Sequence, residues 1–341
     1  MIYYPVCIPT LNRYEHLKAC VESLQRCTHA DKTELIIGLD ALPPPPNYEV
    51  YREGYEKVKA YLPTITGFAK VTILERDTNY GAERNTESLA EYCLERYDAY
   101  IFTEDDNVFS PCFLDYMDKA LECYRDDERI FSVCGFCHPG NYGLSEGCVH
   151  LEYDNSAWGT GYWGNKYHEA TRVIKDKSFL SHATSRSMSK KFVNTYPRGF
   201  RMLLNMIRFD CSWGDVKFAT YNVLTNHYQV KPALSLVRNI GNDGSGIHCG
   251  VDTTLNRQEI SSDTTFNFPD NIEMLRTDVI GRGPLWHAMP TDPQAYIKEK
   301  KDMLRQARIL HLLCVFPLLR RIQWYAHRYW LGILRRCGRP V

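Results

Sequence analysis

The chain has 341 residues, of which 44% are hydrophobic and 24% are charged, so it can bury a sizeable core and is not expected to be disordered. Lysine plus arginine and aspartate plus glutamate are balanced at 41 each, which argues against a nucleic-acid-binding protein. The 13 cysteines lack the paired spacing of a zinc finger, and we interpret most of them as small buried hydrophobic residues in a reducing compartment.

The first 140 residues alternate strand-like with helix-like segments. Apolar, β-branched runs predict strands, and apolar residues at helical spacing, such as Leu17, Val21 and Leu24, predict the helices between them. The predicted strands cover residues 2–10, 33–40, 69–76, 99–106 and 129–136, and the predicted helices cover 14–27, 48–62, 81–97 and 111–127. This alternation predicts an α/β fold with a mostly parallel sheet flanked by helices.

The second half of the chain is less regular. Residues 141–170 are rich in Gly, Tyr and Trp and favour a loop-built pocket floor, whereas residues 187–228 have helical character. Residues 235–250 predict a strand that runs into a flexible glycine-rich loop. Because no linker or repeat is visible, we predict one domain over residues 1–290, divided into halves at 1–140 and 141–290, followed by a helical tail over 291–341.

The tail is strongly basic. Residues 305–341 contain eight arginines and no acidic residue, and "FPLLRRIQWYAHRYWLGILRRCGR" interleaves arginines with apolar residues at helical spacing. Such an amphipathic helix is typical of a peripheral membrane contact, with its arginines on anionic headgroups. A helix docked on the rest of the chain and an interface with a partner protein are the alternatives.

Polar residues gather where predicted strands end. In "YIFTEDDNVF", Glu104, Asp105 and Asp106 follow a buried strand, and the ends of parallel strands are where such sheets bind ligands. Three adjacent carboxylates repel one another unless a cation lies among them, and oxygen ligands suit Mg²⁺ or Mn²⁺. The alternative is a solvated acidic turn. The same edge is predicted to receive residues after the first two strands, namely Pro9, Thr10, Asn12, Arg13 and Asp40.

Several segments together carry a family resemblance. "CIPTLNRYEHLKACVESL", a second strand that ends in Asp40, "NYGAERNTESL" and "YIFTEDDNVF" resemble a GT-A glycosyltransferase of the family 2 type over residues 1–125. "SLVRNIGNDGSGIHCG" resembles a segment of bacterial sugar transferases and extends the likeness to about residue 250. The "EDD" triplet, with "SWGD" and "NDGSGIHCG", is similar to the N-acetylglucosaminyltransferase I type.

The resemblance implies an inverting, metal-dependent transfer of a hexosyl or N-acetylhexosaminyl group. The donor would be a nucleotide-diphosphate sugar, with UDP favoured, and the acceptor a carbohydrate or lipid-linked glycan hydroxyl, as in bacterial surface polysaccharide synthesis. Residues 1–140 would then form the nucleotide-binding half and residues 141–290 the acceptor-binding half. The donor-binding residues it implies are Pro9, Thr10, Asn12, Arg13, Asp40, Asn79, Arg84, Asn85, Glu104 and Asp105.

The remaining roles concern the metal, the base and the acceptor. Asp106 and His248 are the implied ligands of Mn²⁺ or Mg²⁺, and Asp215, favoured over Asp210, is the implied catalytic base. The implied walls for sugar stacking are Trp158, Trp163 and Trp213. Structural alternatives stay open: a cap for Asp40, an ion pair of Arg84 with the triplet, a surface position for His248, helix caps for the two aspartates and core packing for each tryptophan.

Two other functions remain in view. A sugar-1-phosphate nucleotidyltransferase would share the α/β architecture and the metal, but it calls for a glycine-rich phosphate loop after the first strand, and "IPTLNRYEH" contains no glycine. A non-catalytic sugar-nucleotide or carbohydrate-binding module would have no base. We expect a cytoplasmic protein, peripheral at the inner face of the membrane.

Overall fold

The computed structural model describes residues 2–45, 48–140, 143–245, 251, 253–262, 265–269, 271–272, 292–316 and 319. Its strands are β1 (Val6–Thr10), β2 (Glu34–Leu39), β3 (Lys70–Glu75), β4 (Ala99–Phe102), β5 (Asn107–Phe109), β6 (Ile130–Cys134), β7 (Val149–Glu152), β8 (Thr160–Trp163), β9 (Tyr228–Pro232) and β10 (Val237–Asn239). Its α-helices are α1 (Tyr14–Gln25), α2 (Tyr48–Tyr61), α3 (Gly81–Leu94), α4 (Phe113–Cys123), α5 (Gly164–Ile174), α6 (Phe179–Ala183), α7 (Arg186–Thr195), α8 (Pro197–Phe209), α9 (Gly214–Thr225), α10 (Thr253–Asn256) and α11 (Pro293–Val315).

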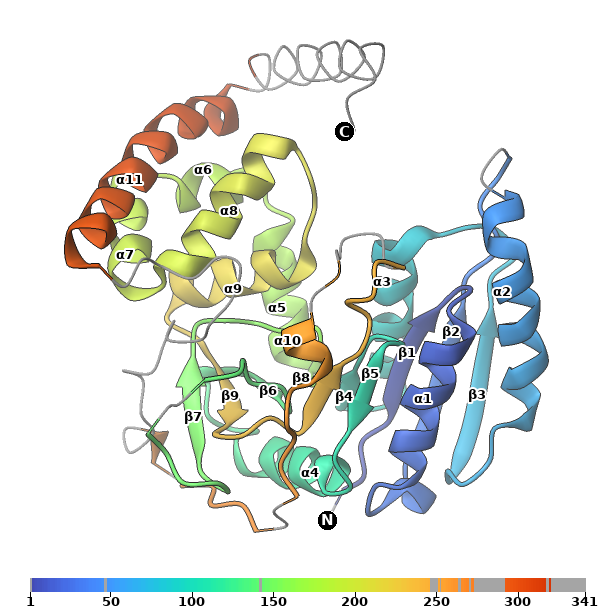
Figure 1. Ribbon diagram of the computed structural model, residues 1–341. Helices are drawn as coiled ribbons and strands as arrows, with labels where there is room; N and C mark the ends of the chain where they lie inside the picture. Colours follow the sequence, from blue (N-terminus) through green and yellow to red (C-terminus); the bar gives the residue numbers. More distant parts are fainter. Residues whose placement is uncertain are drawn as a thin grey trace. The chain divides into compact units, whose positions relative to one another are not determined.

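A central sheet organises the strands in the order β3-β2-β1-β4-β8-β6-β9-β7 (Figure 1). Strands β3, β2, β1 and β4 run parallel, as do β6 and β9. β8 lies antiparallel between β4 and β6, and β7 pairs antiparallel with β9. A separate two-stranded ribbon joins β5 and β10. The predicted α/β fold with a mostly parallel sheet flanked by helices is confirmed.

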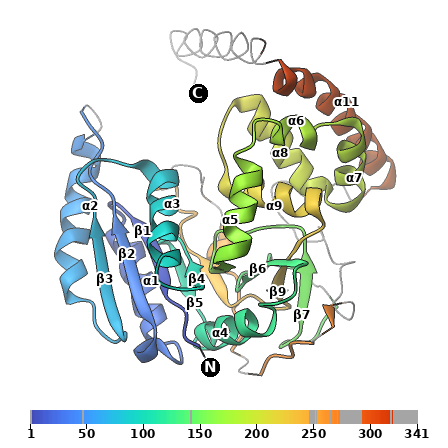
Figure 2. The same ribbon diagram turned by 180° about the vertical axis from the view of Figure 1, so that it is seen from behind.

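Helices cover both faces of the parallel strands. α1 and α2 lie side by side on one face, and α3 packs against β1, β2 and β4 on the other (Figures 1 and 2). The helical spacing in α1 is borne out, because Leu17, Val21 and Leu24 are all fully buried. Strands β1 and β2 are buried along nearly their whole length, as expected for strands covered on both faces.

The loop prediction for residues 141–170 is wrong in part, because this segment contributes β7 and β8 and the start of α5. The glycines there mark close packing. A Cβ on Gly161, within β8, would lie 2.9 Å from Leu121 and 3.0 Å from Met117, so α4 approaches the strand too closely for a side chain. Gly159 similarly faces Phe113. The glycine-rich composition therefore reflects a buried strand under a helix.

The chain divides into two compact units: the first comprises residues 1–169 and 227–285, and the second comprises residues 170–226 and 286–341. The first contains the ten strands named above. The second contains α6 to α9 and α11, and within it α11 packs against α6, α7 and α8. Asp292 caps α11 by accepting a bond from the backbone N–H of Ala295 at 2.7 Å. A C-terminal helix is thus present, as predicted, while residues 320–341 lie outside the described part of the chain.

Four free cysteines are fully buried in the core, in agreement with the prediction that cysteines act as small buried hydrophobic residues: Cys7, Cys20, Cys93 and Cys134. Within the described ranges, no helix combines the length and the apolar character needed to cross a bilayer.

Candidate functional site

Three loops meet at the carboxyl edge of the parallel strands in the first unit. Thr10 pairs with Leu39 across β1 and β2, and Cys7 pairs with Phe102 across β1 and β4, so the segments that follow these strands emerge at one edge. β8 runs antiparallel to β4, with Thr160 beside Phe102, and therefore begins at the same edge. The sequence-predicted donor residues after β1, β2 and β4 are brought together there.

The three carboxylates of the acidic triplet have different partners. Asp106 Oδ2 lies 2.5 Å from the Arg13 guanidinium. Thr10 donates its hydroxyl to Asp105 Oδ2 at 2.7 Å. Trp158 donates its indole N–H to Glu104 Oε2 at 2.8 Å. The triplet is thus no freely solvated turn, because Asp105 and Asp106 are both buried and each carboxylate is held by a named donor.

Charge crowding governs the electrostatics of this cluster. Burial, and then repulsion from Asp106, raises the pKa of Asp105 to about 7, against the opposing effects of Thr10 and Arg13. Burial disfavours the charge on Arg13, but attraction by Asp106, then by Asp105 and Asp243, raises the pKa of Arg13 above its ordinary value. Arg13 is therefore the cation that balances the acids at this edge.

The segment after β10 covers the Arg13–Asp106 pair. Asn239 donates its amide N–H to Asp106 Oδ1 at 2.7 Å, and Gly241 O accepts a bond from Arg13 at 3.3 Å. A Cβ on Gly241 would lie only 1.9 Å from Asp106 Oδ2, so a residue without a side chain is required there. Asp243 approaches the Arg13 guanidinium at 3.9 Å.

Sequence reasoning missed Asn239, Asp243 and His16. Asp243 Oδ2 lies 3.1 Å from His16 Nε2, which joins α1 to the segment after β10. Burial and the nearby charge of Arg13 lower the pKa of His16, against the attraction of Asp243. His16 lies more than 200 positions from both Asn239 and Asp243 in the chain, and the sequence pattern assigned none of the three a role. The polar run "NIGND" was the available signal.

Asp40, which follows β2, is buried, and its carboxylate caps the start of α3. Both of its carboxylate oxygens accept backbone bonds, from the N–H groups of Tyr80 at 2.7 Å and Gly81 at 2.8 Å. Asn79 donates to the same carboxylate at 3.2 Å and to Ala41 O at 2.6 Å. The structural alternative for Asp40 is therefore present in the fold, and its contact with a nucleotide stays a prediction.

Other predicted donor residues flank this edge. Asn85 is buried and bridges α3 to β2, donating to Gly38 O at 2.9 Å and accepting from Arg76 at 3.1 Å. The exposed Arg84 lies with its guanidinium 3.9 Å from the centre of the Tyr80 ring. These contacts fix the amide of Asn85 within the protein but leave Arg84 on the surface.

Residues Pro9 and Asn12 shape the first loop through their backbone. Pro9 is half-buried in β1 and pairs with Gly38 of β2. A Cβ on Gly54 of α2 would lie 2.1 Å from Asn12 O, so α2 packs directly on this loop. That close packing holds the backbone leading into Arg13.

The tryptophans predicted as sugar walls have different positions. Trp158 is half-buried at the strand edge, its ring packed edge-on against Phe136 with centroids 4.6 Å apart. Trp163 is 2% exposed and donates its indole N–H to Leu121 O at 3.1 Å, which suits a core residue rather than a sugar contact. Trp213 belongs to the second unit, where it is half-buried at the N-cap position of α9.

Both candidate bases lie in the second unit. Asp210 is exposed and ends α8 in the left-handed backbone conformation, with φ of 52°. Asp215 is half-buried in the first turn of α9, and its Oδ1 accepts a bond from the backbone N–H of Val216 at 2.8 Å. A helix-terminal position, the structural alternative for each, is thus observed, and the catalytic role stays a prediction.

Asp106, a predicted ligand of the metal ion, already contacts a positively charged side chain. Among the described residues, no group of three His, Cys, Asp or Glu side chains is arranged to hold a metal ion, and the Arg13 guanidinium lies against Asp106. Carboxylate oxygens from Asp105, Asp106 and Asp243 nevertheless surround that guanidinium, and such hard oxygen donors suit Mg²⁺ or Mn²⁺. His248, the second predicted ligand, lies outside the described residues.

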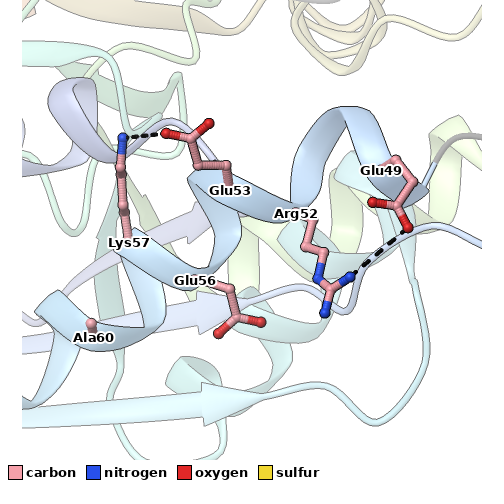
Figure 3. Close-up of a pocket in the computed structure, with 6 residues that line it drawn as sticks. All are labelled: Glu49, Arg52, Glu53, Glu56, Lys57 and Ala60. Atoms are coloured by element: carbon pink, nitrogen blue, oxygen red, sulfur yellow. Dashed lines mark hydrogen bonds and ion pairs between the residues drawn. The ribbon is translucent and has the colours of Figure 1, made fainter.

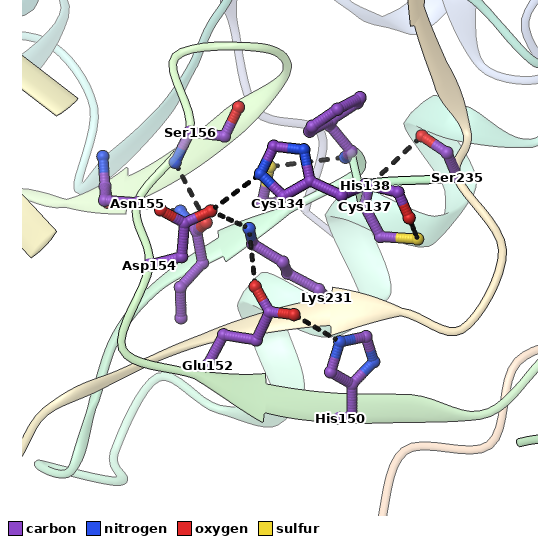
Figure 4. A network of polar contacts seen from close by, with 12 residues as sticks. Cys134, Cys137, His138, His150, Glu152, Asp154, Asn155, Ser156, Lys231 and Ser235 are labelled. Atoms are coloured by element: carbon purple, nitrogen blue, oxygen red, sulfur yellow. Dashed lines mark hydrogen bonds and ion pairs between the residues drawn. The ribbon is translucent and has the colours of Figure 1, made fainter. Parts of the chain in front are cut away.

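A second polar cluster is buried around β7, the strand at one edge of the sheet, and its neighbour β9 (Figure 4). Lys231, fully buried, lies 2.7 Å from Asp154 and 3.0 Å from Glu152. His138 contacts Asp154 at 3.3 Å and His150 contacts Glu152 at 3.2 Å. Burial disfavours the charge on Lys231, but Asp154 and Glu152 raise its pKa, so we describe the cluster as an ion-paired anchor for the segment that leads to Trp158.

A surface hollow on α2 was considered as an alternative site to the strand edge (Figure 3). Its lining comes from one helix, and charges pair along that helix, as between Lys57 and Glu53 at 2.7 Å and between Arg52 and Glu49 at 3.9 Å. Pairs of this kind at helical spacing are typical of a solvated helix face. We therefore place the candidate site at the strand edge.

Comparisons with known proteins give a limited result. No family model matches the sequence, and no curated protein matches it either. Among solved structures, the chain is similar to the mannosyltransferase PcManGT from Pyrobaculum calidifontis in complex with GDP-Man and Mn²⁺, at 12% identity and a TM-score of 0.33, covering 51% of this chain and 46% of that one. It is also similar to S. aureus TarS in complex with UDP-GlcNAc, at 12% identity and a TM-score of 0.35, covering 50% and 48%. The chain thus spans about half the length of these proteins.

Proposed function

We propose that this chain is an inverting GT-A glycosyltransferase of the family 2 type that uses a nucleotide-diphosphate sugar, with UDP favoured. The observation that carries the proposal is the meeting of Arg13, Thr10 and the triplet Glu104–Asp106 at the carboxyl edge of β1, β2 and β4. A cation and hydrogen-bonding groups gathered at such an edge suit the diphosphate and hydroxyls of a sugar nucleotide.

In the proposed reaction, an acceptor hydroxyl oxygen attacks the anomeric carbon of the donor sugar. The bond from that carbon to the diphosphate oxygen breaks, and the nucleoside diphosphate leaves with the electron pair. Asp215, or Asp210 in its place, takes the hydroxyl proton as the new glycosidic bond forms. Arg13 supplies positive charge to the diphosphate, and Thr10 and Trp158 orient Asp105 and Glu104 toward the donor's hydroxyls.

A divalent ion, when bound, would neutralise charge on the departing diphosphate. In this proposal Asp106 and His248 hold it, with Asp105 beside them. The chemistry of the donor set is compatible with Mn²⁺ or Mg²⁺, because oxygen ligands predominate.

Replacement of Asp106 tests the function. Asp106→Asn should abolish release of nucleoside diphosphate and transfer of the sugar, measured by mass spectrometry of product with UDP-, GDP- and TDP-sugars in the presence of Mn²⁺. Asp31→Asn, an exposed acid in the short helix Ala30–Lys32, serves as the matched control. Full transfer by Asp106→Asn would refute the assignment. Formation of a nucleoside triphosphate and a sugar 1-phosphate when pyrophosphate is added to the wild-type chain and the sugar nucleotide would identify a nucleotidyltransferase instead.

The C-terminal segment is proposed to contact the inner face of the membrane, where a lipid-linked glycan would be presented. Supporting this, Ile309, Leu312 and Phe316 are exposed at helical spacing near the end of α11, with Arg305 and Arg308 exposed beside them. Truncation before Leu318, combined with Ile309→Ser, Leu312→Ser and Phe316→Ser, should weaken sedimentation with vesicles that contain anionic lipid. Unchanged sedimentation would remove the membrane proposal and leave the transferase proposal intact.

A further inference from the structure

The contact between Trp158 and Glu104 follows from the pairing of two strands. Phe102, the last residue of β4, lies opposite Thr160, the first residue of β8. If this antiparallel register is continued two residues past these ends, Glu104 faces Trp158. There Trp158 donates its indole N–H to Glu104 Oε2 at 2.8 Å. The strand register therefore determines which donor this carboxylate meets.

The donor is uncharged, which matters beside Asp105 and Asp106. Repulsion from two adjacent acids favours a Glu104 carboxylate that points away from them, and a hydrogen bond opposes that tendency. The indole N–H fixes the direction of the carboxylate without cancelling its charge, whereas the Arg13 guanidinium balances the charge of Asp106. The bond from Trp158 thus sets a direction and leaves the charge of Glu104 unaltered.

Trp158 is itself held by Ser156. Ser156 Oγ accepts the backbone N–H of Trp158 at 3.2 Å, and Ser156 O accepts the hydroxyl of Thr160 at 2.5 Å. Between them, Gly159 has a φ of 72°, and a Cβ there would lie 2.9 Å from Phe113. The backbone is therefore fixed on both sides of Trp158, which defines where the indole points.

Gln229 of β9 holds Ser156 from inside the sheet. Its Oε1 accepts the backbone N–H of Ser156 at 3.1 Å, and its Nε2 donates to Ser132 Oγ at 3.0 Å and to Asn155 Oδ1 at 3.2 Å. Gln229 is fully buried, and Ser132 lies opposite it in β6. Because no part of Gln229 reaches the surface, it can influence a ligand only through these partners.

We propose that Gln229 is a positioning residue for the donor site: through Ser156 and Trp158, it sets the direction in which Glu104 presents its carboxylate to a hydroxyl of the donor. The inference rests on the proposed function, since a bound sugar nucleotide supplies that hydroxyl. Hydrogen bonds between neutral groups link Gln229 to Trp158. Removal of the Gln229 amide should therefore alter the direction of Glu104 without altering its charge.

The indole N–H resonance of Trp158 tests this link without any ligand. A ¹⁵N–¹H spectrum of the chain labelled with ¹⁵N-tryptophan resolves the indole signals of the six tryptophans, and the signal that is lost in Trp158→Phe identifies Trp158. Gln229→Met should move this signal in the same direction as Glu104→Gln does, because both changes weaken a charge-assisted hydrogen bond. An unmoved signal in a folded Gln229→Met would overturn the proposal.

Gln25→Met is the matched control, because the Gln25 amide also makes a hydrogen bond, to Thr66 O at 2.7 Å, but on the surface. It should leave the Trp158 signal in place, and a shift equal to that of Gln229→Met would overturn the proposal. Ser156→Ala is a smaller change in the same chain of bonds and serves if Gln229→Met does not fold. It should also move the Trp158 signal, and an unmoved signal would again overturn the proposal.

Donor affinity separates this proposal from the proposed function. UDP-, GDP- and TDP-glucose are titrated under the conditions of the transfer assay, and the tightest binder is the probe. Gln229→Met should weaken its binding about tenfold in the wild-type background, but less than about twofold in the Glu104→Gln background, since both changes affect one contact. Equal effects in both backgrounds would overturn the positioning role. Movement of the Trp158 signal without binding of any of the three would support the link to Glu104 and refute the proposed function.

Discussion

Lys231 and Asp154 form an ion pair deep in the first unit, with Nζ 2.7 Å from Oδ2, and Glu152 adds a second carboxylate at 3.0 Å. Two buried acids share one buried cation, and both histidines of the cluster contact the acids rather than the lysine. Removal of the cation would leave two adjacent negative charges in a site with little water.

Lys231→Met is therefore expected to lower the free energy of unfolding by about 3–5 kcal/mol, since an uncompensated buried charge is left behind. Urea denaturation followed by circular dichroism measures the change. Lys70→Met is the matched control, because Lys70 pairs with Glu34 at 2.9 Å but is largely exposed, and its loss should have little effect on stability. Similar losses in both variants would contradict the anchor role of Lys231.

The raised pKa of Asp118 predicts that the free energy of unfolding depends on pH. Burial, and repulsion from Asp115 and Glu122, raise the pKa of Asp118 to about 7, although the Tyr4 backbone N–H opposes this. The unfolded chain has a pKa near 4 for this group, roughly the ordinary value. Since the folded state holds the proton more tightly, the stabilising contribution is complete below about pH 4 and is lost as the pH rises to about 7.

Asp118→Asn keeps the acceptor for Tyr4 and removes the titration. The variant should gain stability relative to the wild-type chain as the pH rises from about 4 to about 7, by an amount on the order of a few kcal/mol. Thermal unfolding at a series of pH values measures the difference, with Asp31→Asn as the exposed control. A difference that is the same at every pH would show that Asp118 ionises normally.

Gly241→Ala should disrupt the Arg13–Asp106 pair, because the added methyl group would overlap Asp106 Oδ2. We expect a loss of about 1–3 kcal/mol in stability together with weaker UDP-sugar binding, measured by thermal shift with and without ligand. Gly214→Ala is the control for stability, since a Cβ there meets nothing within 4 Å. Unimpaired ligand binding in Gly241→Ala would argue against the strand edge as the donor site.

The two candidate bases can be separated kinetically. Asp215→Asn should reduce kcat by at least about 100-fold with little effect on donor binding, whereas Asp210→Asn should have a small effect. Product formation and equilibrium UDP binding are measured on the same preparations. The reverse order of effects would assign the base to Asp210, and full activity of both variants would exclude a proton-accepting role for either.

Local patterns were enough to predict the architecture. The helical spacing of apolar residues identified α1, and apolar runs identified β1 and β2. These predictions were possible because each burial pattern repeats within a few residues. β8 escaped prediction because Gly161 meets α4, a contact that local composition does not encode. At the site, Asp106 was found from its strand-end motif, but its bonds to Arg13 and Asn239 span 93 and 133 residues and follow only from the folded topology.

Asp40 has a practical consequence for mutational work on this chain. Its carboxylate ties the start of α3 to the end of β2 through the N–H groups of Tyr80 and Gly81. An inactive Asp40→Ala protein would thus report a loosened helix as readily as a lost ligand contact. If the acids at the strand edge were replaced one by one and only activity were measured, Asp40 would be taken for a ligand-binding residue. Measuring the stability of the variant as well distinguishes a structural role of Asp40 from a ligand contact.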